Sequence, residues 1–382
     1  MSKKILFVTG TRADFGKMKS VITAVSGVFN VEIFVTGMHL MTRFGSTWNE
    51  VRDLGIGQIF PFVNQSETDS MPSILAKTIQ GLSDFVRESK PDLIFVHGDR
   101  IETLAGAVVG TLTNTLVGHI EGGEISGTVD EMIRHAVSKL ANYHFVSNEQ
   151  ARELLLQMGE SDQRIFVVGS PDIDIMFSSS LPTLSEVVSR YEIPFEHYSI
   201  AILHPVVTEI EKLNSCASLF FQALQESHRK FILIEPNNDQ GHEIISEEID
   251  KLRTNSRFRI FPSMRFEYFL TLLKNSDFII GNSSAGVREA PYYGVPCIDV
   301  GSRQEGRFDS SQIIKVDFHK SQILKAISNV SSHDRNVTMN FGIKGSSERI
   351  RNILLQDSFW SISTQKKFLK RSVSFGIQED IT

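Results

Sequence analysis

The sequence contains only two cysteines among its 382 residues, Cys216 and Cys297, which lie in separate apolar segments without CxxC spacing. This scarcity argues against a disulfide framework and a zinc knuckle, and it favours a reducing, cytoplasmic location. Long apolar runs are also missing, because no stretch reaches the roughly 18 residues of a membrane span. The first apolar run, residues 5–8, is too short for a signal peptide. We therefore expect no membrane contact.

Basic residues are not in excess. Lys and Arg number 39 against 45 Asp and Glu, which gives a formal net charge of −6. A protein without an overall positive field does not attract phosphate backbones, so nucleic acid is not an expected partner. The remaining composition, 41% hydrophobic and 22% charged residues, is that of an ordinary globular protein whose length suits two domains.

Short apolar runs rich in Val, Ile and Phe alternate with longer segments of helical period. This pattern is typical of parallel strands joined by crossover helices. It pauses at a polar, proline-containing stretch near residues 170–195 and then starts again. We therefore predict an α/β protein with two Rossmann-like, doubly wound domains and an interdomain cleft. The expected strands are 4–9, 31–36, 93–97, 116–121, 144–146 and 165–168, followed by 200–203, 231–235, 259–261, 278–281 and 295–300.

The predicted boundaries are 1–170 for the N-terminal domain, 171–358 for the C-terminal domain and 359–382 for a terminal helix or tail. Residues 346–367 are expected to form one or two helices, which could return to the first domain through Trp360. Open α/β sheets bind ligands at the carboxyl ends of their strands. Functional residues should therefore follow strands directly.

The first strand is followed by a turn suited to an anion. Residues 9–16, Thr-Gly-Thr-Arg-Ala-Asp-Phe-Gly, form a glycine turn that opens a helix and carries Arg12 and Asp14. A helix start with an arginine beside it attracts anions. The alternative is an ordinary helix start in which Arg12 pairs with Asp14.

A second turn of this kind gives the strongest single signal. Residues 281–289, Gly-Asn-Ser-Ser-Ala-Gly-Val-Arg-Glu, follow an apolar strand and start a helix. The hydroxyls of Ser283 and Ser284, with free backbone N–H groups, would face the cleft as a diphosphate requires. Glu289 could reach ribose hydroxyls. The alternative is a helix cap with a solvated glutamate.

Three further strand ends supply polar groups to the same cleft. His204 follows one expected strand, Asn237 follows another, and Arg303 and Arg307 follow a third. The arginines would add positive charge near a phosphate. The alternatives are a structural histidine before proline and exposed loop arginines.

Carboxylates gather on the opposite side of the cleft. Side chains alternate along a strand, so His97 shares a face with Asp99, and His119 with Glu121, at neighbouring strand ends. Together with Asp130 these carboxylates should crowd into one wall. Like charges and partial burial would raise the pKa of at least one of them, which suits proton transfer at neutral pH.

Two alternatives for this wall stay open. One is a set of separate ion pairs, Asp99 with Arg100 or Asp130 with Arg134. The other is a zinc or manganese site, because two histidines and two carboxylates suit those ions. We favour the metal-free interpretation, because a strand histidine often only hydrogen-bonds the backbone.

These motifs, in this order, resemble the hydrolysing UDP-N-acetylglucosamine 2-epimerases of sialic acid biosynthesis, most closely those of bacterial capsule pathways. The resemblance extends from residue 4 to about residue 365. Related non-hydrolysing epimerases carry Pro-Glu in place of Ala13-Asp14 and Gly-Gly in place of Ser283-Ser284, so the hydrolysing branch is favoured. The motifs are 10–14, 35–39, 97–100, 119–124, 134–135, 169–171, 281–289 and 301–304.

The resemblance implies the GT-B architecture and the conversion of UDP-N-acetylglucosamine and water into N-acetylmannosamine and UDP. It implies Asp99, Glu121 and Asp130 as the reacting carboxylates, without assigning base and acid among them, and we add His204 beside the diphosphate. The substrate and UDP contacts that we predict are Arg12, Asp14, Arg100, Asn237, Met264 through its backbone, Ser283, Ser284, Glu289 and Arg303.

We expect no cofactor and no metal, because protein cations and helix N–H groups would hold the leaving group, and the resemblance suggests a homodimer or homotetramer. The sugar stays open, because legionaminate-type pathways use a similar enzyme on a UDP-2,4-diacetamido-2,4,6-trideoxy sugar. Feedback by CMP-sialate is also open. A GT-B glycosyltransferase or a non-catalytic nucleotide-sugar sensor would use the same cleft.

Overall fold

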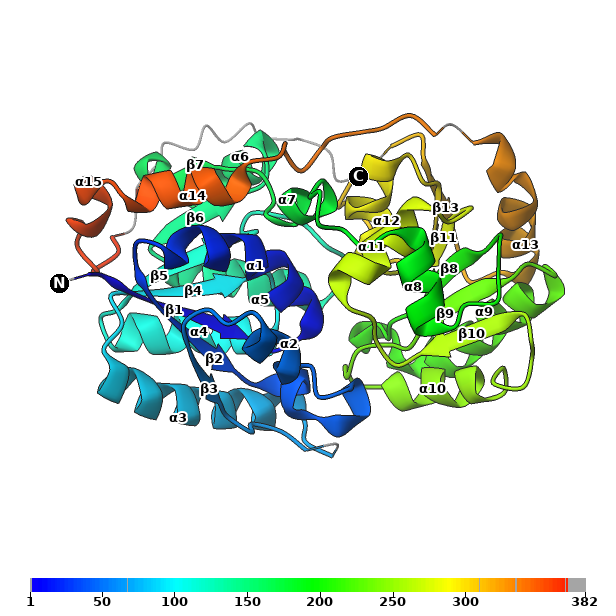
Figure 1. The fold of residues 1–382 in the computed structure, drawn as a ribbon, viewed down its shortest axis with the longest axis horizontal. Coiled ribbons are helices and arrows are strands. Elements are labelled where there is room, and N and C mark those ends of the chain that lie inside the picture. Colours follow the sequence, from blue (N-terminus) through cyan, green and yellow to red (C-terminus); the bar gives the residue numbers. More distant parts are fainter. Residues whose placement is uncertain (1, 67, 309, 334, 368, 370–382) are drawn as a thin grey trace, which may run out of the picture.

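The computed structural model describes residues 2–66, 68–308, 310–333, 335–367 and 369, and it contains two parallel sheets that lie side by side (Figure 1). The first has seven strands in the order β3-β2-β1-β4-β5-β6-β7, and the second has six in the order β10-β9-β8-β11-β12-β13. In each sheet the chain begins centrally and moves outward to both edges, as in doubly wound folds. The strands are β1 (Lys4–Thr9), β2 (Asn30–Val35), β3 (Gln58–Pro61), β4 (Leu93–His97), β5 (Leu116–Ile120), β6 (Tyr143–Val146), β7 (Ile165–Val167), β8 (Ser199–Ile202), β9 (Phe231–Ile234), β10 (Phe258–Phe261), β11 (Ile279–Gly281), β12 (Cys297–Val300) and β13 (Ile313–Val316).

Helices connect most successive strands and cover both faces of each sheet. Across the described part of the chain, no helix combines the length and the apolar character that a bilayer crossing requires. The helices are α1 (Arg12–Ser26), α2 (Trp48–Asp53), α3 (Met71–Ser89), α4 (Ile101–Leu112), α5 (Val129–Leu140), α6 (Glu149–Gln157), α7 (Asp172–Met176), α8 (Leu184–Tyr191), α9 (Leu213–Glu226), α10 (His242–Asp250), α11 (Phe266–Lys274), α12 (Ser284–Arg288), α13 (Lys320–Asn329), α14 (Ser346–Leu354) and α15 (Asp357–Trp360). Short 3₁₀ helices are η1 (Gly37–Leu40), η2 (Thr42–Phe44), η3 (Asp162–Arg164), η4 (Val207–Lys212), η5 (Ala290–Tyr293) and η6 (Val330–Ser332).

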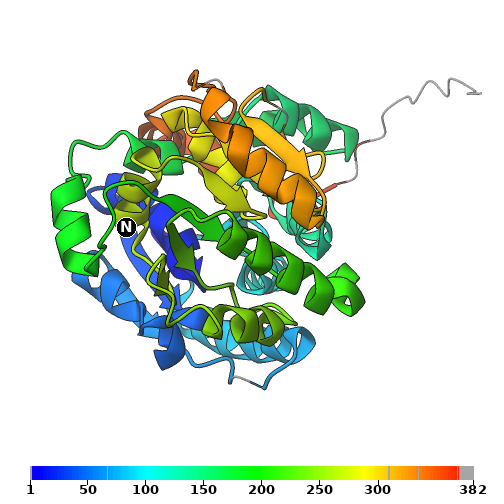
Figure 2. The same cartoon turned by 90° about the vertical axis from the view of Figure 1, so that its right-hand side faces the viewer.

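The central strands bury side chains on both faces, which explains their continuous apolar runs. In β1, Ile5 and Phe7 pack with α1 and α14, whereas Leu6 and Val8 pack with α3, α4 and α5. In the second sheet, Ile200 packs with α8 and α11, while α9, α10 and α13 cover the opposite face. The view turned by 90° shows α9 (green) beside α13 (orange) on that face (Figure 2).

The α/β class predicted from the sequence is confirmed, and every expected strand is present with ends within two residues of the prediction. Strands β3 and β13 were not predicted, because they are short edge strands with partly exposed residues. An edge strand buries less apolar surface than a central one, so its apolar run is weaker. The predicted domain boundaries remain predictions.

The segment after the second sheet returns to the first one (Figure 1). Helix α14 packs on α1, and the ring of Phe359 stacks on Tyr143 with 4.0 Å between ring centroids. The hydroxyl of Tyr143 also donates to the backbone oxygen of Phe359 at 2.5 Å. Residues 368 and 370–382 of the predicted tail lie outside the described residues.

Phe359→Ala should lower the free energy of unfolding by about 3 kcal/mol, the usual loss when a buried aromatic ring is truncated. Phe359 is 4% exposed, whereas nearby Leu355 is 47% exposed, so Leu355→Ala is the matched control and should change little. Urea unfolding of both variants measures the difference. Equal effects would show that the stacked ring does not anchor the segment.

Candidate active site

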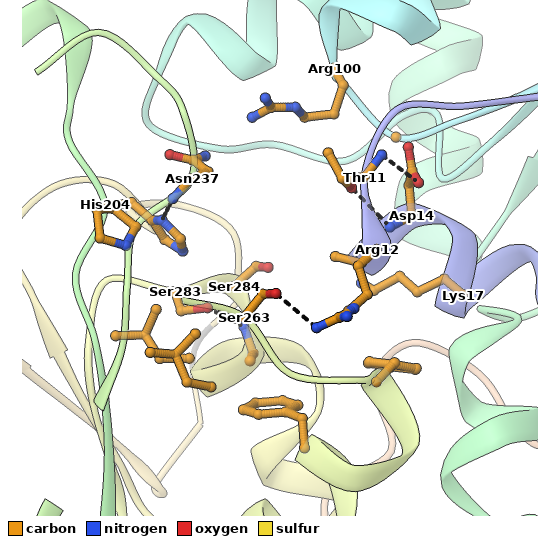
Figure 3. Close-up of a pocket in the computed structure, with 18 of the residues that line it drawn as sticks. Thr11, Arg12, Asp14, Lys17, Arg100, His204, Asn237, Ser263, Ser283 and Ser284 are labelled. Carbon is orange, nitrogen blue, oxygen red and sulfur yellow. Dashed lines mark hydrogen bonds between the residues drawn. The ribbon is translucent and has the colours of Figure 1, made fainter. Parts of the chain in front are cut away.

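A cavity of about 310 Å³ lies between the two sheets, at the carboxyl ends of their central strands. In the close-up, Arg12 and Lys17 enter from α1, Arg100 from above, and His204 and Asn237 from the other half (Figure 3). The cavity lining contains every residue that the sequence analysis proposed for the site: Arg12, Asp14, Asp99, Arg100, Glu121, Asp130, His204, Asn237, Met264, Ser283, Ser284, Glu289 and Arg303.

The turn after β1 is fixed by a capping box. The side chain of Thr11 accepts a hydrogen bond from the backbone of Asp14, and Asp14 accepts from Gly10 N at 3.0 Å and from Thr11 N at 3.1 Å. Arg12 does not pair with Asp14, contrary to the alternative in the sequence analysis. Its guanidinium pairs with Glu50 at 2.6 Å and donates to Ser263 Oγ at 2.7 Å. Asp14 therefore shapes the turn, while Arg12 reaches across the cleft.

Three loops of the second sheet are tied together by Asn282, which follows β11. Its side-chain oxygen accepts from His204 N at 2.7 Å, and its side-chain nitrogen donates to His204 O at 2.9 Å. Its backbone oxygen accepts from Arg303 Nη1 at 3.2 Å. A Cβ atom on the preceding Gly281 would lie 1.8 Å from Ile202 O, so only glycine allows this close approach. These bonds bring His204, Arg303 and the serines at 283 and 284 to one side of the cavity.

The hydrogen bonds of His204 define its tautomer. Its Nδ1 accepts from Asn237 N at 3.2 Å. Burial and, after it, the positive charge of Arg303 lower the pKa of His204 to about 3, so the ring is neutral near pH 7. A neutral ring that accepts at Nδ1 carries its proton on Nε2. His204 can therefore donate a hydrogen bond into the cavity.

The carboxylates opposite each have an arginine, but not the one that the sequence analysis considered. Asp99 pairs with Arg134, and Asp130 pairs with Arg303 at 3.0 Å. The predicted alternatives, Asp99 with Arg100 and Asp130 with Arg134, are wrong because the strand ends turn these side chains toward other loops. Arg100 instead pairs with Asp239 at 3.0 Å.

The charges around the three carboxylates shift their pKa values in different directions. Burial opposes ionisation of Asp99 and Glu121, but Arg134 beside the first and Arg288 beside the second hold both pKa values below the usual range. Burial and the neighbouring Asp99 raise the pKa of Asp130. At least one raised pKa is expected from the crowding of these carboxylates, and Asp130 is the one that has it.

Two cations of the site were missed. Lys17 lies on α1, one turn after Asp14, and its Nζ is 3.1 Å from Glu289 Oε1 and 4.0 Å from Glu121 Oε1. Arg288 donates to Glu121 Oε1 at 2.5 Å. Both could have been suspected from sequence, since Lys17 shares a helix face with Asp14 and Arg288 lies within the 281–289 motif.

The histidines of the carboxylate wall do not gather around a common point. The ring of His119 lies 2.8 Å from the backbone oxygen of Gly98, as expected for a strand histidine bonded to the backbone. His97 lies 3.3 Å from Glu121. Within the described ranges no group of three or more His, Cys, Asp or Glu side chains is arranged to hold a metal ion. The metal-free interpretation stays a prediction.

Known proteins are similar to this chain in both sequence and fold. The family model described as UDP-N-acetylglucosamine 2-epimerase matches residues 23–355. A UDP-N-acetylglucosamine 2-epimerase of Neisseria meningitidis serogroup B is 46% identical over 373 residues, covering 96% of this chain and 99% of that protein. A UDP-N,N'-diacetylbacillosamine 2-epimerase (hydrolyzing) of Legionella pneumophila is 36% identical over 86% of this chain and 88% of that protein. The crystal structure of a Neisseria meningitidis UDP-GlcNAc 2-epimerase bound to UDP-GlcNAc superposes with a TM-score of 0.78 at 21% identity, covering 92% of this chain and 99% of that chain.

Two doubly wound parallel sheets that face one another across a charged cleft define an α/β protein of the GT-B architecture. The family model covers most of the chain and the Neisseria relative matches nearly all of it. The chain belongs to the UDP-N-acetylglucosamine 2-epimerase family, as its motifs predicted.

Nuclear magnetic resonance of protein labelled with ¹⁵N-histidine should show His204 as the neutral Nε2–H tautomer from about pH 5 to pH 8. Burial and the Asn237 N–H···Nδ1 hydrogen bond both favour this form. The signal is assigned by its loss in His204→Gln. A signal that titrates near the ordinary value of 6.5 would contradict the arrangement.

Proposed function

We propose that this protein is a hydrolysing UDP-N-acetylglucosamine 2-epimerase. It converts UDP-N-acetylglucosamine and water into N-acetylmannosamine and UDP, the first step of sialic acid biosynthesis. The observation that carries the proposal is the division of one cavity into two walls. Carboxylates form one wall, and hydroxyl, imidazole and guanidinium donors form the other.

The donor wall suits a departing diphosphate. Ser283, Ser284 and the Nε2–H of His204 supply neutral donors, and Arg303 and Arg12 supply positive charge. Donors already fixed in place stabilise the charge that develops when the C1–O bond breaks.

The remaining contacts suit the nucleotide. Glu289 is 2% exposed, and its Oε2 has no hydrogen-bond partner, so it can accept from a ribose hydroxyl. We assign Arg100, Asn237 and the backbone of Met264 to the rest of UDP, because they match the family's nucleotide positions and line the same cavity.

The chemical difficulty is the C2 proton, which has no adjacent carbonyl to make it acidic. When the bond from C1 to the phosphate oxygen stretches, the ring gains oxocarbenium character and the C2 proton becomes removable by a carboxylate. The C2–H electron pair then forms the C1=C2 bond of a glycal, and UDP leaves with the C1–O pair. Water next adds its oxygen to C1 while a proton returns to C2.

The product has the opposite configuration at C2, so the proton must return from the face opposite to the one it left. One carboxylate therefore has to be ionised and another protonated. The pKa values of Asp99 and Glu121 lie below the usual range, so both are ionised and able to accept a proton, and the raised pKa of Asp130 suits proton return. Asp130 also contacts Arg303, on the side of the departing diphosphate.

The hydrolysing mode is favoured by Ala13-Asp14 and Ser283-Ser284, which replace the Pro-Glu and Gly-Gly of non-hydrolysing relatives. A second candidate substrate is a UDP-2,4-diacetamido-2,4,6-trideoxy sugar, because the Legionella relative is named for UDP-N,N'-diacetylbacillosamine. The higher identity to the Neisseria protein favours UDP-N-acetylglucosamine. A homodimer or homotetramer without a cofactor stays part of the proposal.

The purified protein, incubated with UDP-N-acetylglucosamine and EDTA in heavy water, should release UDP and free N-acetylmannosamine with one deuterium at C2. Elimination discards the original proton, and hydration takes the new one from solvent. Mass spectrometry and proton NMR of the products measure both events.

Other products would identify the alternatives. UDP-N-acetylmannosamine would indicate the non-hydrolysing reaction, and a donor consumed only with an added acceptor would indicate a glycosyltransferase. Activity lost in chelator and restored by zinc or manganese would support a metal site. Retention of the C2 proton would rule out elimination.

Glu121→Gln should preserve UDP binding and lower kcat on the order of 100-fold or more, because the amide keeps the shape but accepts no proton. Glu131→Gln is the control, since Glu131 caps Ser126 N at 2.7 Å and pairs with His135, and it should keep kcat near the wild-type value. Calorimetric UDP titration and steady-state kinetics separate the two effects. Equal losses of affinity and turnover would mean that Glu121 holds the nucleotide.

A further inference from the structure

Arg288 is a buried cation at the end of α12, and it contacts the carboxylate wall without lining the cavity itself. Its side chain is 1% exposed. It donates to Glu121 Oε1 and Glu124 Oε2, each at 2.5 Å, and to Ser170 Oγ at 2.7 Å. The guanidinium also lies 4.3 Å from the centre of the Phe341 ring. Its planar fork is therefore held on several sides.

Arg288 makes the shortest contact of the cations that face Glu121, at 2.5 Å to its Oε1, whereas His97 Nε2 lies at 3.3 Å and Lys17 Nζ at 4.0 Å. Burial alone would raise the pKa of Glu121, and Arg288 is the strongest of the charges that lower it, ahead of Lys17 and His97. A carboxylate must be ionised to take a proton from carbon. A neutral residue in place of Arg288 would leave Glu121 buried with less compensation, so it would hold its own proton more readily.

Helix α12 connects this contact to the donor wall. Ser283 and Ser284 stand at its start and Arg288 at its end, and five helical residues span only about 7 Å. Gly286 lets the helix lie close to β12, since a Cβ there would be 2.4 Å from Cys297 Sγ. One short, closely packed helix therefore carries both the diphosphate hydroxyls and the cation that holds Glu121.

We propose that Arg288 is a positioning residue that keeps Glu121 ionised and aimed at the sugar C2, in register with the diphosphate site at the other end of α12. This inference rests on the proposed function and deepens it. A purely structural role is the competing explanation, because Arg288 also joins the two halves of the molecule. The two explanations differ in how turnover depends on pH.

The test compares the pH profile of kcat in the wild type, Arg288→Lys and Arg288→Met. Arg288→Lys loses the planar guanidinium but keeps the positive charge. The buried glutamates therefore keep a cationic partner, and this variant is the one expected to stay folded. Each unit by which the pKa of Glu121 rises costs about tenfold in the ionised fraction below that pKa. We expect the acidic limb of the profile to move to higher pH, by roughly one unit in Arg288→Lys and by more in Arg288→Met. The Kd of UDP, measured by calorimetry, should stay near the wild-type value.

Lys19→Met is the matched control. Lys19 makes another ion pair between the halves, with Glu267 at 2.5 Å, and lies away from the catalytic cavity. It should leave the acidic limb in place. In protein that already carries Glu121→Gln, adding Arg288→Lys should lower kcat little further, because the carboxylate that Arg288 positions is already gone.

Three results would count against the inference. An unshifted acidic limb in both Arg288 variants, with a lower Tm and normal kcat per folded molecule, would make Arg288 purely structural. The same shift in Lys19→Met would assign the effect to the fit of the two halves. Wild-type protein that binds UDP but releases neither UDP nor sugar from UDP-N-acetylglucosamine would refute the proposed function, and this inference with it.

Discussion

The buried ion pairs of Arg288 with Glu121 and Glu124 join the two halves of the molecule at the wall of the catalytic cavity. Arg288 belongs to the second sheet's helix α12, whereas both glutamates follow β5 of the first sheet. Removing one member of such a buried set typically costs about 3–5 kcal/mol, because the remaining charge is left without compensation. The placement of the halves and the charge state of the site therefore depend on the same contacts. Further ion pairs, including Arg100 with Asp239, repeat this arrangement along the cleft.

The topology of the sheets explains why residues far apart in sequence meet there. In the second sheet β8 lies between β9 and β11, so the loops that carry His204, Asn237 and Ser283 are neighbours. In the first sheet β1, β4 and β5 are adjacent, so the loops that carry Arg12, Asp99 and Glu121 follow one another along the edge of the sheet. Parallel strands point all of these loops in one direction, so the polar and charged side chains that they carry gather at the carboxyl edge of each sheet.

The placement of functional residues at strand ends explains how much of the site could be predicted from the sequence. Strand ends are visible as apolar runs, so the central strands and most of the proposed lining residues followed from position and motif, whereas Met264 followed from the family resemblance. The pairing of charges did not follow, because Arg288 and Glu121 are 167 residues apart and meet only through the packing of α12. Partner choice depends on side-chain direction at the end of each strand, which is why Asp130 contacts Arg303 rather than Arg134. Edge strands β3 and β13 were not predicted for a simpler reason, since they bury little apolar surface.

The same pairing bears on how the site binds an anion. Several cations that line the cavity already have a carboxylate partner, as Arg12 has Glu50, Arg303 has Asp130 and Lys17 has Glu289. A site built this way keeps its donors in place before any ligand arrives, so little reorganisation is needed when negative charge develops on a leaving group. The free energy of diphosphate binding is then the difference between the ion pairs that these cations make with the ligand and those that they already make with carboxylates. Affinity for the nucleotide can stay moderate while the transition state, which carries more charge on the phosphate oxygen, gains more from the same donors.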